Sequence, residues 1–250
     1  MTQSQLSEAA GVLVKTTCVD YPGRLAVSFF LKGCNLCCPY CYNRELVSPT
    51  TSSDVKLNTI QELFDHLQKR QGIIKGLVIS GGEALLNPLT PEIIKKAKSL
   101  DYKIKLDTNG TLPEKLEYFI NQNELRPDFI AMDIKTSPER YATQLCPSFS
   151  KFYENKDHFI FAIQKSIELV SQYKTENREF RTVLVPPLVQ KSDILEIAKY
   201  IPSDSSWQFA QFMPKNCLNE KYNKILPYSD NEASELVSLA KSLIPGAELR

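Results

Sequence analysis

Four cysteines stand within eight residues near the start of the chain, in the run GCNLCCPYCYN. Three of them, Cys34, Cys38 and Cys41, have the spacing C-x3-C-x2-C. Three thiolates on one short loop can ligate three irons of a cubane 4Fe–4S cluster, which normally takes four cysteine ligands. The fourth iron then has no protein ligand and is open to a small molecule, like the open position of a catalytic metal site. The spacing therefore indicates a catalytic iron–sulfur centre.

Two other interpretations of these cysteines stay open. Cys34 with Cys37, and Cys38 with Cys41, form C-x2-C pairs of the kind that bind zinc. Such pairs are usually separated by about a dozen residues or more so that the chain can wrap the ion, whereas here they abut. A buried, inert cluster is the second alternative, because free cysteine packs as a small hydrophobic residue. The iron–sulfur interpretation requires Cys37 to be a bystander.

The composition is that of an ordinary globular protein, with 42% hydrophobic and 24% charged residues and a net charge of +1. We expect a single domain over residues 1–250. We expect no nucleic-acid or membrane partner, because there is neither a strong field nor an apolar run of roughly 18 residues. We expect no secretory signal, because the N-terminus MTQSQLSEAA lacks a basic region and an apolar core. Seven cysteines, four of them together, favour metal or redox chemistry over disulfides. These features predict a cytoplasmic protein.

Short apolar runs alternate with segments of helical period. Six runs are predicted strands: Leu25–Leu31, Gly76–Ser80, Lys103–Asp107, Phe129–Asp133, Phe180–Val185 and Trp207–Phe212. One helix is predicted to begin with Asn58 as its N-cap, supported by Gln61 three residues later. The last predicted helix covers about 229–243 and begins with a capping box of Ser229 and Glu232. Strands that alternate with helices predict parallel βαβ units. Six units are too few for a closed eight-stranded barrel, so the predicted fold is α/β, an open, partial (β/α)6 barrel.

The polar motifs fall where the predicted strands end, which is where parallel sheets and barrels carry their active sites. The cysteine loop follows the first strand, GGE follows the second, DTN ends the third, MDIK ends the fourth and QFMP ends the sixth. We therefore expect these side chains to share one pocket.

Each motif also has a purely structural explanation. The glycines of GGE allow close approach to a ligand, and Glu83 can accept hydrogen bonds from an ammonium group, but a strand-to-helix turn needs the same glycines. DTNG fits a plain Asx turn. Asp133 and Lys135 share one face of a strand, and an exposed edge lysine is the alternative for Lys135. Arg181 suits a carboxylate or ribose hydroxyls, but it can equally pair with Glu179.

The cysteine spacing followed by GGE resembles the signature of the radical S-adenosylmethionine (SAM) superfamily. The resemblance implies that the open iron chelates the amino and carboxylate groups of SAM, and that the reduced cluster splits the sulfonium to give a 5′-deoxyadenosyl radical. It implies cluster ligation by Cys34, Cys38 and Cys41. The SAM site that it implies consists of Tyr40, Gly81, Gly82, Glu83, Asp107, Thr108, Asn109, Asp133, Lys135, Arg181 and Gln211. Ala84 stands where many members have proline, which affects turn stiffness more than ligand chemistry.

A narrower resemblance rests on VDYPG, KLDTNG, AMDIK and EFRTVLVP. Taken alone, VDYPG reads as a type II turn. Followed by RLAVSFFLKGC, it is similar to the segment before the cysteine loop in glycyl-radical-enzyme activases, above all those of the anaerobic (class III) ribonucleotide reductase. The likeness runs from about residue 11 to residue 214 and implies that Asp20 takes part in catalysis, close to the substrate glycine. It also implies a glycyl-radical enzyme as partner and a flavodoxin or ferredoxin as electron donor, and we expect the chain to be monomeric on its own.

Two rival functions remain at this point. One is a radical SAM enzyme that acts on a small molecule, nucleobase or peptide, and the other is a non-catalytic iron–sulfur or zinc protein that carries electrons or senses. The other cysteines, Cys18, Cys146 and Cys217, are isolated and are interpreted as core or surface thiols. The two histidines, His66 and His158, fall in helical segments, so no hydrolytic site is expected.

Overall fold

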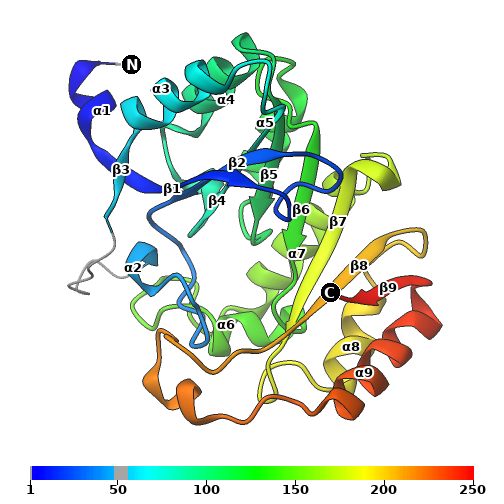
Figure 1. Ribbon diagram of the computed structural model, residues 1–250. Helices are drawn as coiled ribbons and strands as arrows, with labels where there is room; N and C mark the ends of the chain where they lie inside the picture. Colours follow the sequence, from blue (N-terminus) through cyan, green and yellow to red (C-terminus); the bar gives the residue numbers. More distant parts are fainter. Residues whose placement is uncertain (1, 48–55) are drawn as a thin grey trace. The chain divides into compact units, whose positions relative to one another are not determined.

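A computed structural model describes residues 2–47 and 56–250, which form two compact units (Figure 1). The first unit takes in the described residues of Met1–Asn35, Glu45–Thr108 and Glu114–Ile130. The second takes in Leu36–Arg44, Asn109–Pro113 and Ala131–Arg250. The predicted single domain over residues 1–250 stays a prediction.

The first unit is built on a sheet with the strand order β3-β1-β2-β4-β5. Its strands are β1 (Ala9–Thr17), β2 (Ala26–Leu31), β3 (Asn58–Thr59), β4 (Gly76–Gly81) and β5 (Lys103–Thr108). β2 pairs with β4 in parallel from Ala26 opposite Gly76, and β4 pairs with β5 in parallel from Gly76 opposite Lys103. β1 and β3 are antiparallel additions at the edge. The helical segments are α1 (Gln3–Ser7), α2 (Arg44–Val47), α3 (Ile60–Arg70), η1 (Ala84–Leu86), α4 (Thr90–Ser99) and α5 (Pro113–Asn121).

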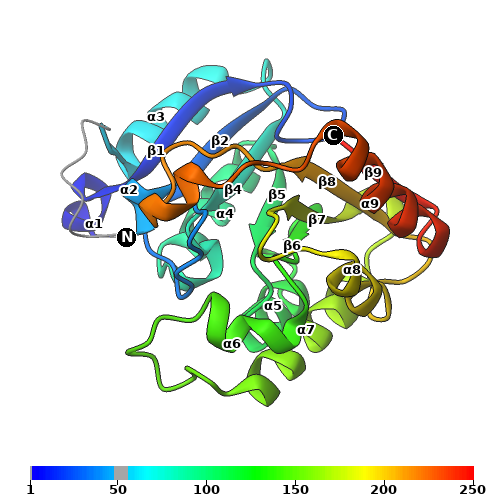
Figure 2. The same ribbon diagram turned by 90° about the horizontal axis from the view of Figure 1, so that it is seen from below.

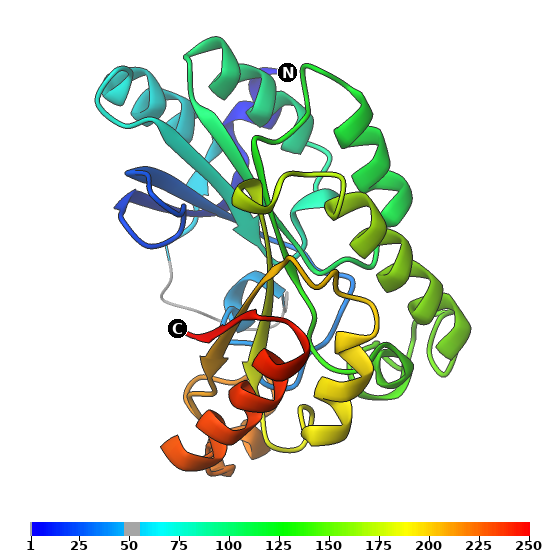
Figure 3. The same ribbon diagram turned by 90° about the vertical axis from the view of Figure 1, so that its right-hand side faces the viewer.

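The second unit has the strand order β7-β8-β9, with both pairings parallel. Its strands are β7 (Arg178–Leu184), β8 (Ser206–Gln211) and β9 (Gly246–Leu249), and β6 (Phe129–Asp133) begins in the first unit and ends in the second. Its helical segments are η2 (Pro138–Arg140), α6 (Tyr141–Gln144), α7 (Lys156–Val170), η3 (Thr175–Asn177), α8 (Lys191–Ala198), η4 (Glu220–Lys224) and α9 (Asp230–Leu243). α8 and α9, yellow and red in Figure 3, lie side by side.

The predicted fold class is confirmed. All six predicted strands are present as β2, β4, β5, β6, β7 and β8, with ends within two residues of those predicted. Each unit's strand order ends at an edge strand, β3 in the first and β9 in the second, so the arrangement is open rather than closed. The strands β1, β3 and β9 were not predicted. Within the described segments, no helix is long and apolar enough to cross a membrane.

The helix caps gave one correct and one wrong prediction. Ser229 caps α9 and forms the predicted capping box with Glu232. The cap of α3 is Thr59 with Glu62, not Asn58 with Gln61. Asn58 instead belongs to β3, where its side-chain oxygen accepts a hydrogen bond from the Leu13 N–H at 3.1 Å. The prediction was wrong because both asparagine and threonine serve as N-caps, and the sequence does not show that Asn58 is held in an edge strand.

Burial of the central strands explains their sequences. Ala26, Val27, Phe29 and Leu31 of β2 are all fully buried. A parallel strand covered on both faces reads as a nearly continuous apolar run, as this strand does. The rigid strands therefore fix the points from which the polar loops begin.

Candidate active site: the cysteine loop and the strand ends

The cysteine loop leaves β2 and has no helix or strand before α2. Cys38 is buried, Cys34 and Cys41 are half-buried, and Cys37 is exposed. The Cys41 N–H donates to the Cys38 carbonyl at 3.0 Å, so one tight turn brings these two residues together. The Cys37 N–H is bound by the Leu145 carbonyl at 2.7 Å. The exposure of Cys37 sets it apart from the three cysteines of the predicted ligand set, and that ligand set stays a prediction.

The GGE turn packs against the start of the cysteine loop in the first unit. The Gly82 N–H donates to the Leu31 carbonyl at 2.9 Å, and the Glu83 N–H donates to the Gly33 carbonyl at 2.8 Å. A Cβ atom on Gly82 would overlap the Gly33 carbonyl and would lie 3.2 Å from the Cβ of Cys34. Only glycine fits this approach, so Gly82 has a packing role beside Cys34.

Glu83 is a buried carboxylate with a fixed orientation. Its Oε1 atom accepts hydrogen bonds from the Leu85 N–H at 3.1 Å and from the Thr108 hydroxyl at 2.9 Å. Thr108 is the last residue of β5, so two neighbouring strand ends meet at this carboxylate. The structure thus brings together Cys34, Gly82, Glu83 and Thr108, and Gly81 ends the strand that leads into them.

Asp107 has a partner that the sequence motifs did not single out. Lys105 is 1% exposed, and its Nζ atom lies 2.7 Å from Oδ1 of Asp107 and 5.8 Å from the ring centroid of Phe129. Charged residues are almost never fully buried unless they are paired. The spacing K-x-D on a strand, which places both side chains on one face, is the signal that could have revealed this pair.

Asp20 lies beside β2 rather than at the strand end. The Ser28 hydroxyl donates to Oδ2 of Asp20 at 2.7 Å, and the Asp20 N–H donates to the Thr17 hydroxyl at 3.3 Å. The neighbouring Tyr21 is buried and contacts Phe129, with ring centroids 5.8 Å apart. Asp20 is therefore held in place near the third residue of β2, whereas Cys34 follows the last. The role of Asp20 in catalysis stays a prediction.

In the second unit, Asp133 forms ion pairs with two cationic side chains. Its Oδ1 atom lies 2.7 Å from Nε of Arg181, and its Oδ2 atom lies 3.3 Å from Nζ of Lys135. Burial opposes ionisation, but the charges of Arg181 and Lys135 outweigh it and hold the pKa of Asp133 well below its usual range. The nearest Arg181–Glu179 contact is longer, at 3.9 Å, so Asp133 is the closer partner of this arginine. With Glu179 counted, these side chains carry two positive and two negative charges.

Tyr40 and Gln211 carry buried polar atoms without a hydrogen-bond partner. The Tyr40 side chain is 5% exposed, and its hydroxyl is unpartnered, as is Oε1 of Gln211. Burial raises the pKa of Tyr40 well above its usual value, and the charges of Lys135 and Cys38 also act on it. Buried polar groups normally have partners, so these atoms fit a site that is completed by a polar ligand.

Asn109 serves the turn that follows β5. Its side-chain oxygen accepts from the Thr111 N–H at 3.0 Å and from the Thr111 hydroxyl at 2.6 Å, as an Asx turn requires. Gly110 has φ +73°, and a Cβ atom there would overlap Met132. The structural interpretation of DTNG is therefore confirmed for Asn109, and its contact with SAM stays a prediction.

The donor set suits an iron–sulfur cluster by its chemistry. All seven cysteines lie in the described part of the chain, and none forms a disulfide. Across residues 2–47 and 56–250, no three His, Cys, Asp or Glu side chains are grouped closely enough to hold a metal ion. Cys34, Cys38 and Cys41 nonetheless supply three thiols from one irregular loop, and cysteine thiolates are the ligands of such clusters.

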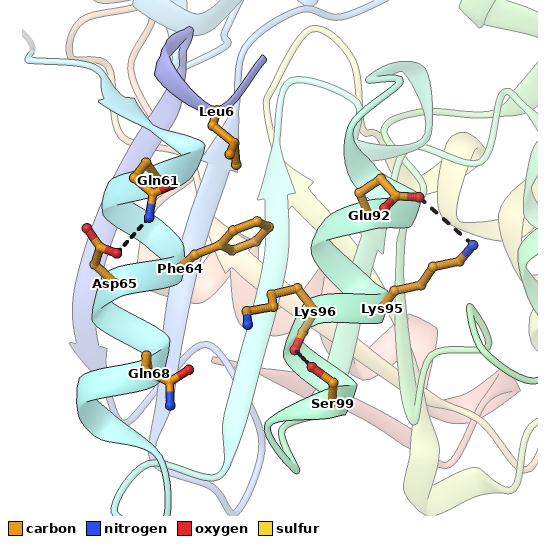
Figure 4. A pocket seen from close by; sticks show the side chains of 9 residues that line it. All are labelled: Leu6, Gln61, Phe64, Asp65, Gln68, Glu92, Lys95, Lys96 and Ser99. Carbon is orange, nitrogen blue, oxygen red and sulfur yellow. Dashed lines mark hydrogen bonds and ion pairs between the residues drawn. The ribbon is translucent and has the colours of Figure 1, made fainter. Parts of the chain in front are cut away.

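A groove elsewhere in the first unit lacks the predicted site residues (Figure 4). It lies between α3 and α4, below Leu6, and includes Phe64, Lys95 and Lys96. Lys95 is paired with Glu124 at 2.9 Å. None of the residues that line this groove belongs to the motifs at the strand ends.

Comparison with known families identifies the superfamily of the chain. The sequence model of the radical SAM superfamily matches residues 28–201, which is more than half of the chain. The chain belongs to the radical SAM superfamily. Membership implies a 4Fe–4S cluster and SAM, and it makes the chain a radical SAM enzyme.

Several relatives differ in the activity that their names give. A protein of Methanocaldococcus jannaschii with the provisional name glycyl-radical enzyme activating enzyme is 31% identical over 239 residues, covering 95% of this chain and 94% of the relative. The 7-carboxy-7-deazaguanine synthase of Aquifex aeolicus is 30% identical over 167 residues, covering 66% and 69%. The anaerobic ribonucleoside-triphosphate reductase-activating protein of Enterobacteria phage T4 is 33% identical over 97 residues, covering 39% and 55%.

The fold is also similar to that of a solved structure. QueE from Escherichia coli superposes with a TM-score of 0.53 at 12% identity, and the match covers 96% of this chain and 91% of that chain. At this identity the likeness concerns the fold alone, and it agrees with the open arrangement of parallel strands.

Proposed function

We propose that this chain is a radical SAM activase that generates a glycyl radical on a partner enzyme, and that the partner is an anaerobic ribonucleotide reductase. The observation that carries the proposal is the 31% identity to the Methanocaldococcus relative, which extends over nearly the whole of both chains. The shorter match to the phage activating protein supports the choice of partner.

The proposed cofactor site uses the three cysteines and the polar strand ends. Cys34, Cys38 and Cys41 are the proposed cluster ligands. The cationic side chains of Lys135 and Arg181 suit the carboxylate of SAM, and the buried Glu83 suits its ammonium group. The remaining proposed SAM-binding residues are Tyr40, Gly81, Gly82, Asp107, Thr108, Asn109 and Gln211.

When bound, the cluster and SAM would supply the one-electron chemistry needed to remove a hydrogen atom from a glycine α-carbon. The chain's own residues orient and neutralise the reactants. Asp133 holds Arg181 and Lys135 in place, and Thr108 fixes Glu83. Asp20, held by Ser28, is the proposed contact to the backbone of the substrate glycine. Glycine suits the target role because no side chain blocks the approach.

The setting of the reaction follows from the same proposal. A low-potential electron must reach the cluster, and a flavodoxin or ferredoxin is the proposed donor. We place the protein in the cytoplasm, because an odd number of cysteines suits a reducing compartment. We also propose that the protein is a monomer when it is apart from its partner.

A radical SAM enzyme that acts on a small molecule is the second candidate. The match to the Aquifex 7-carboxy-7-deazaguanine synthase favours it, since it covers about two thirds of both chains. The Asp20 loop favours the activase, because its resemblance is to activases that act on a protein glycine.

The deciding experiment is electron paramagnetic resonance on the partner. The reconstituted chain is incubated anaerobically with SAM, a reductant and an anaerobic ribonucleotide reductase, and the glycyl radical signal is recorded. A signal that is lost when the reductase's target glycine is replaced by alanine supports the proposal. SAM cleavage without a radical on any glycyl-radical enzyme offered would favour the small-molecule alternative.

A further inference from the structure

The segment after β8 contacts the cysteine loop within the second unit. We call residues 212–219 the brace segment; it lies at the start of the orange stretch between β8 and α9 in Figure 2. The Leu218 N–H donates to the carbonyl of Cys41 at 3.1 Å, and the Asn219 N–H donates to the carbonyl of Pro39 at 2.9 Å. Two carbonyl groups of the loop, one of them on a proposed ligand, are thus bound by the brace segment.

Tyr42 makes the side-chain part of this contact. Its hydroxyl accepts a hydrogen bond from the Met213 N–H at 2.8 Å. Its ring stacks on Phe212, with centroids 6.4 Å apart and planes 15° apart. The Asn216 amide donates to the Tyr42 carbonyl at 3.5 Å. The residue next to Cys41 is therefore bound through its ring, its hydroxyl and its backbone.

The brace segment has its own anchor. Cys217 is fully buried, and its N–H donates to the side-chain oxygen of Asn223 at 2.9 Å. Asn216 has φ +56°, a conformation that asparagine tolerates better than most residues. The segment is therefore a fixed turn against which the cysteine loop is held, while the Leu145 carbonyl binds the loop at Cys37.

We infer that the brace segment keeps the cysteine loop in the conformation that retains the cluster. Tyr42, which follows Cys41 on the loop, is the main positioning residue in this contact. The inference rests on the proposed ligand assignment of Cys38 and Cys41. A loop without regular structure gains order only from such contacts, since fixing each residue costs conformational entropy. When the contacts to the Cys41 carbonyl and to Tyr42 loosen, the loop opens more often and the cluster is lost faster.

The test compares two substitutions that each remove a tyrosine hydroxyl group. Tyr42→Phe keeps the ring stack and removes the acceptor of the Met213 N–H. Tyr228→Phe is the matched control, because its hydroxyl is bonded to the carbonyls of Pro186 and Val189, at 3.2 and 2.9 Å, and not to the loop. Asn223→Ala, which frees the Cys217 N–H, is the second variant.

Each protein is reconstituted anaerobically, and the loss of iron–sulfur absorbance is followed after a chelator is added. We expect Tyr42→Phe and Asn223→Ala to lose the cluster about fivefold faster than the wild type, as the loss of one net hydrogen bond would give, and Tyr228→Phe to match the wild type. Equal rates for Tyr42→Phe and the wild type, or equal acceleration by both tyrosine variants, would overturn the inference. Failure of the proposed function looks different, because wild-type protein with a full cluster would then yield no glycyl radical.

Discussion

Arg181→Met removes one of the two cations that hold Asp133. The Nε–Oδ1 distance is 2.7 Å, and the Arg181 and Asp133 side chains are 23% and 31% exposed. A hydrogen bond to a charged group contributes about 1.5–3 kcal/mol. We therefore expect the free energy of unfolding at pH 7 to fall by about 2 kcal/mol, measured by urea denaturation of the apoprotein.

The matched control is Lys199→Met. Lys199 and Glu196 are 2.6 Å apart, but their side chains are 60% and 40% exposed. Solvent screens such a pair, so its removal should leave the free energy of unfolding nearly unchanged. If both substitutions lowered the free energy of unfolding equally, partial burial of the Asp133–Arg181 pair would not contribute to stability.

The effect of Arg181→Met has a defined pH dependence. The pKa of Asp133 is held below its usual range, chiefly by Arg181 and Lys135 acting against burial. A lowered carboxyl pKa stabilises the fold above the unfolded-state value of about 3.9 and loses this contribution as the pH falls through the lower folded value. The difference between wild type and Arg181→Met should therefore be full at pH 7 and shrink below about pH 4. A difference that grows on acidification would refute the reasoning.

The same substitution should weaken SAM binding to the cluster-loaded protein about tenfold, because one charge-assisted contact to the ligand carboxylate is lost. Equilibrium dialysis measures the dissociation constant, with Lys199→Met again as the control. Unchanged affinity in Arg181→Met would remove this arginine from the proposed SAM site.

Five further substitutions test other parts of the site. Cys37→Ala should keep the cluster and SAM turnover, whereas Cys38→Ala should lose both, as judged by iron content and 5′-deoxyadenosine; the reverse pattern would break the ligand assignment. Thr108→Val, which removes the hydroxyl that orients the GGE carboxylate, should raise the dissociation constant for SAM about fivefold, and an unchanged constant would contradict that role. Ser28→Ala and Asp20→Asn should both leave SAM cleavage by the isolated chain intact but slow radical formation on the partner several-fold; an equal loss of both activities would count against a role in partner binding.

The sequence predicted the strands and strand ends because both have local signals. The buried run of β2 is apolar almost throughout, and the motifs that follow the strands are short and contiguous. The strands β1 and β9 were missed because β1 has a mixed burial pattern and β9 has only four residues. Edge pairing depends on the neighbouring strand, which no local pattern describes.

The supporting contacts of the site could not be predicted. Ser28 sits inside a strand, where nothing in the sequence shows that it binds a carboxylate. The brace segment acts mainly through backbone N–H groups, which every residue other than proline possesses, so it leaves no motif. Cys217, interpreted as an isolated thiol, proved to anchor that segment through its backbone.

The most direct test of the central claim is the yield of 5′-deoxyadenosine from anaerobically reconstituted protein given SAM and dithionite. Cys41→Ala is the control, because it removes one proposed ligand from the loop. We expect product from the wild type and none from the variant. A wild-type protein that carries a full cluster and makes no product, with or without a glycyl-radical enzyme present, would contradict the assignment of radical SAM chemistry to this site.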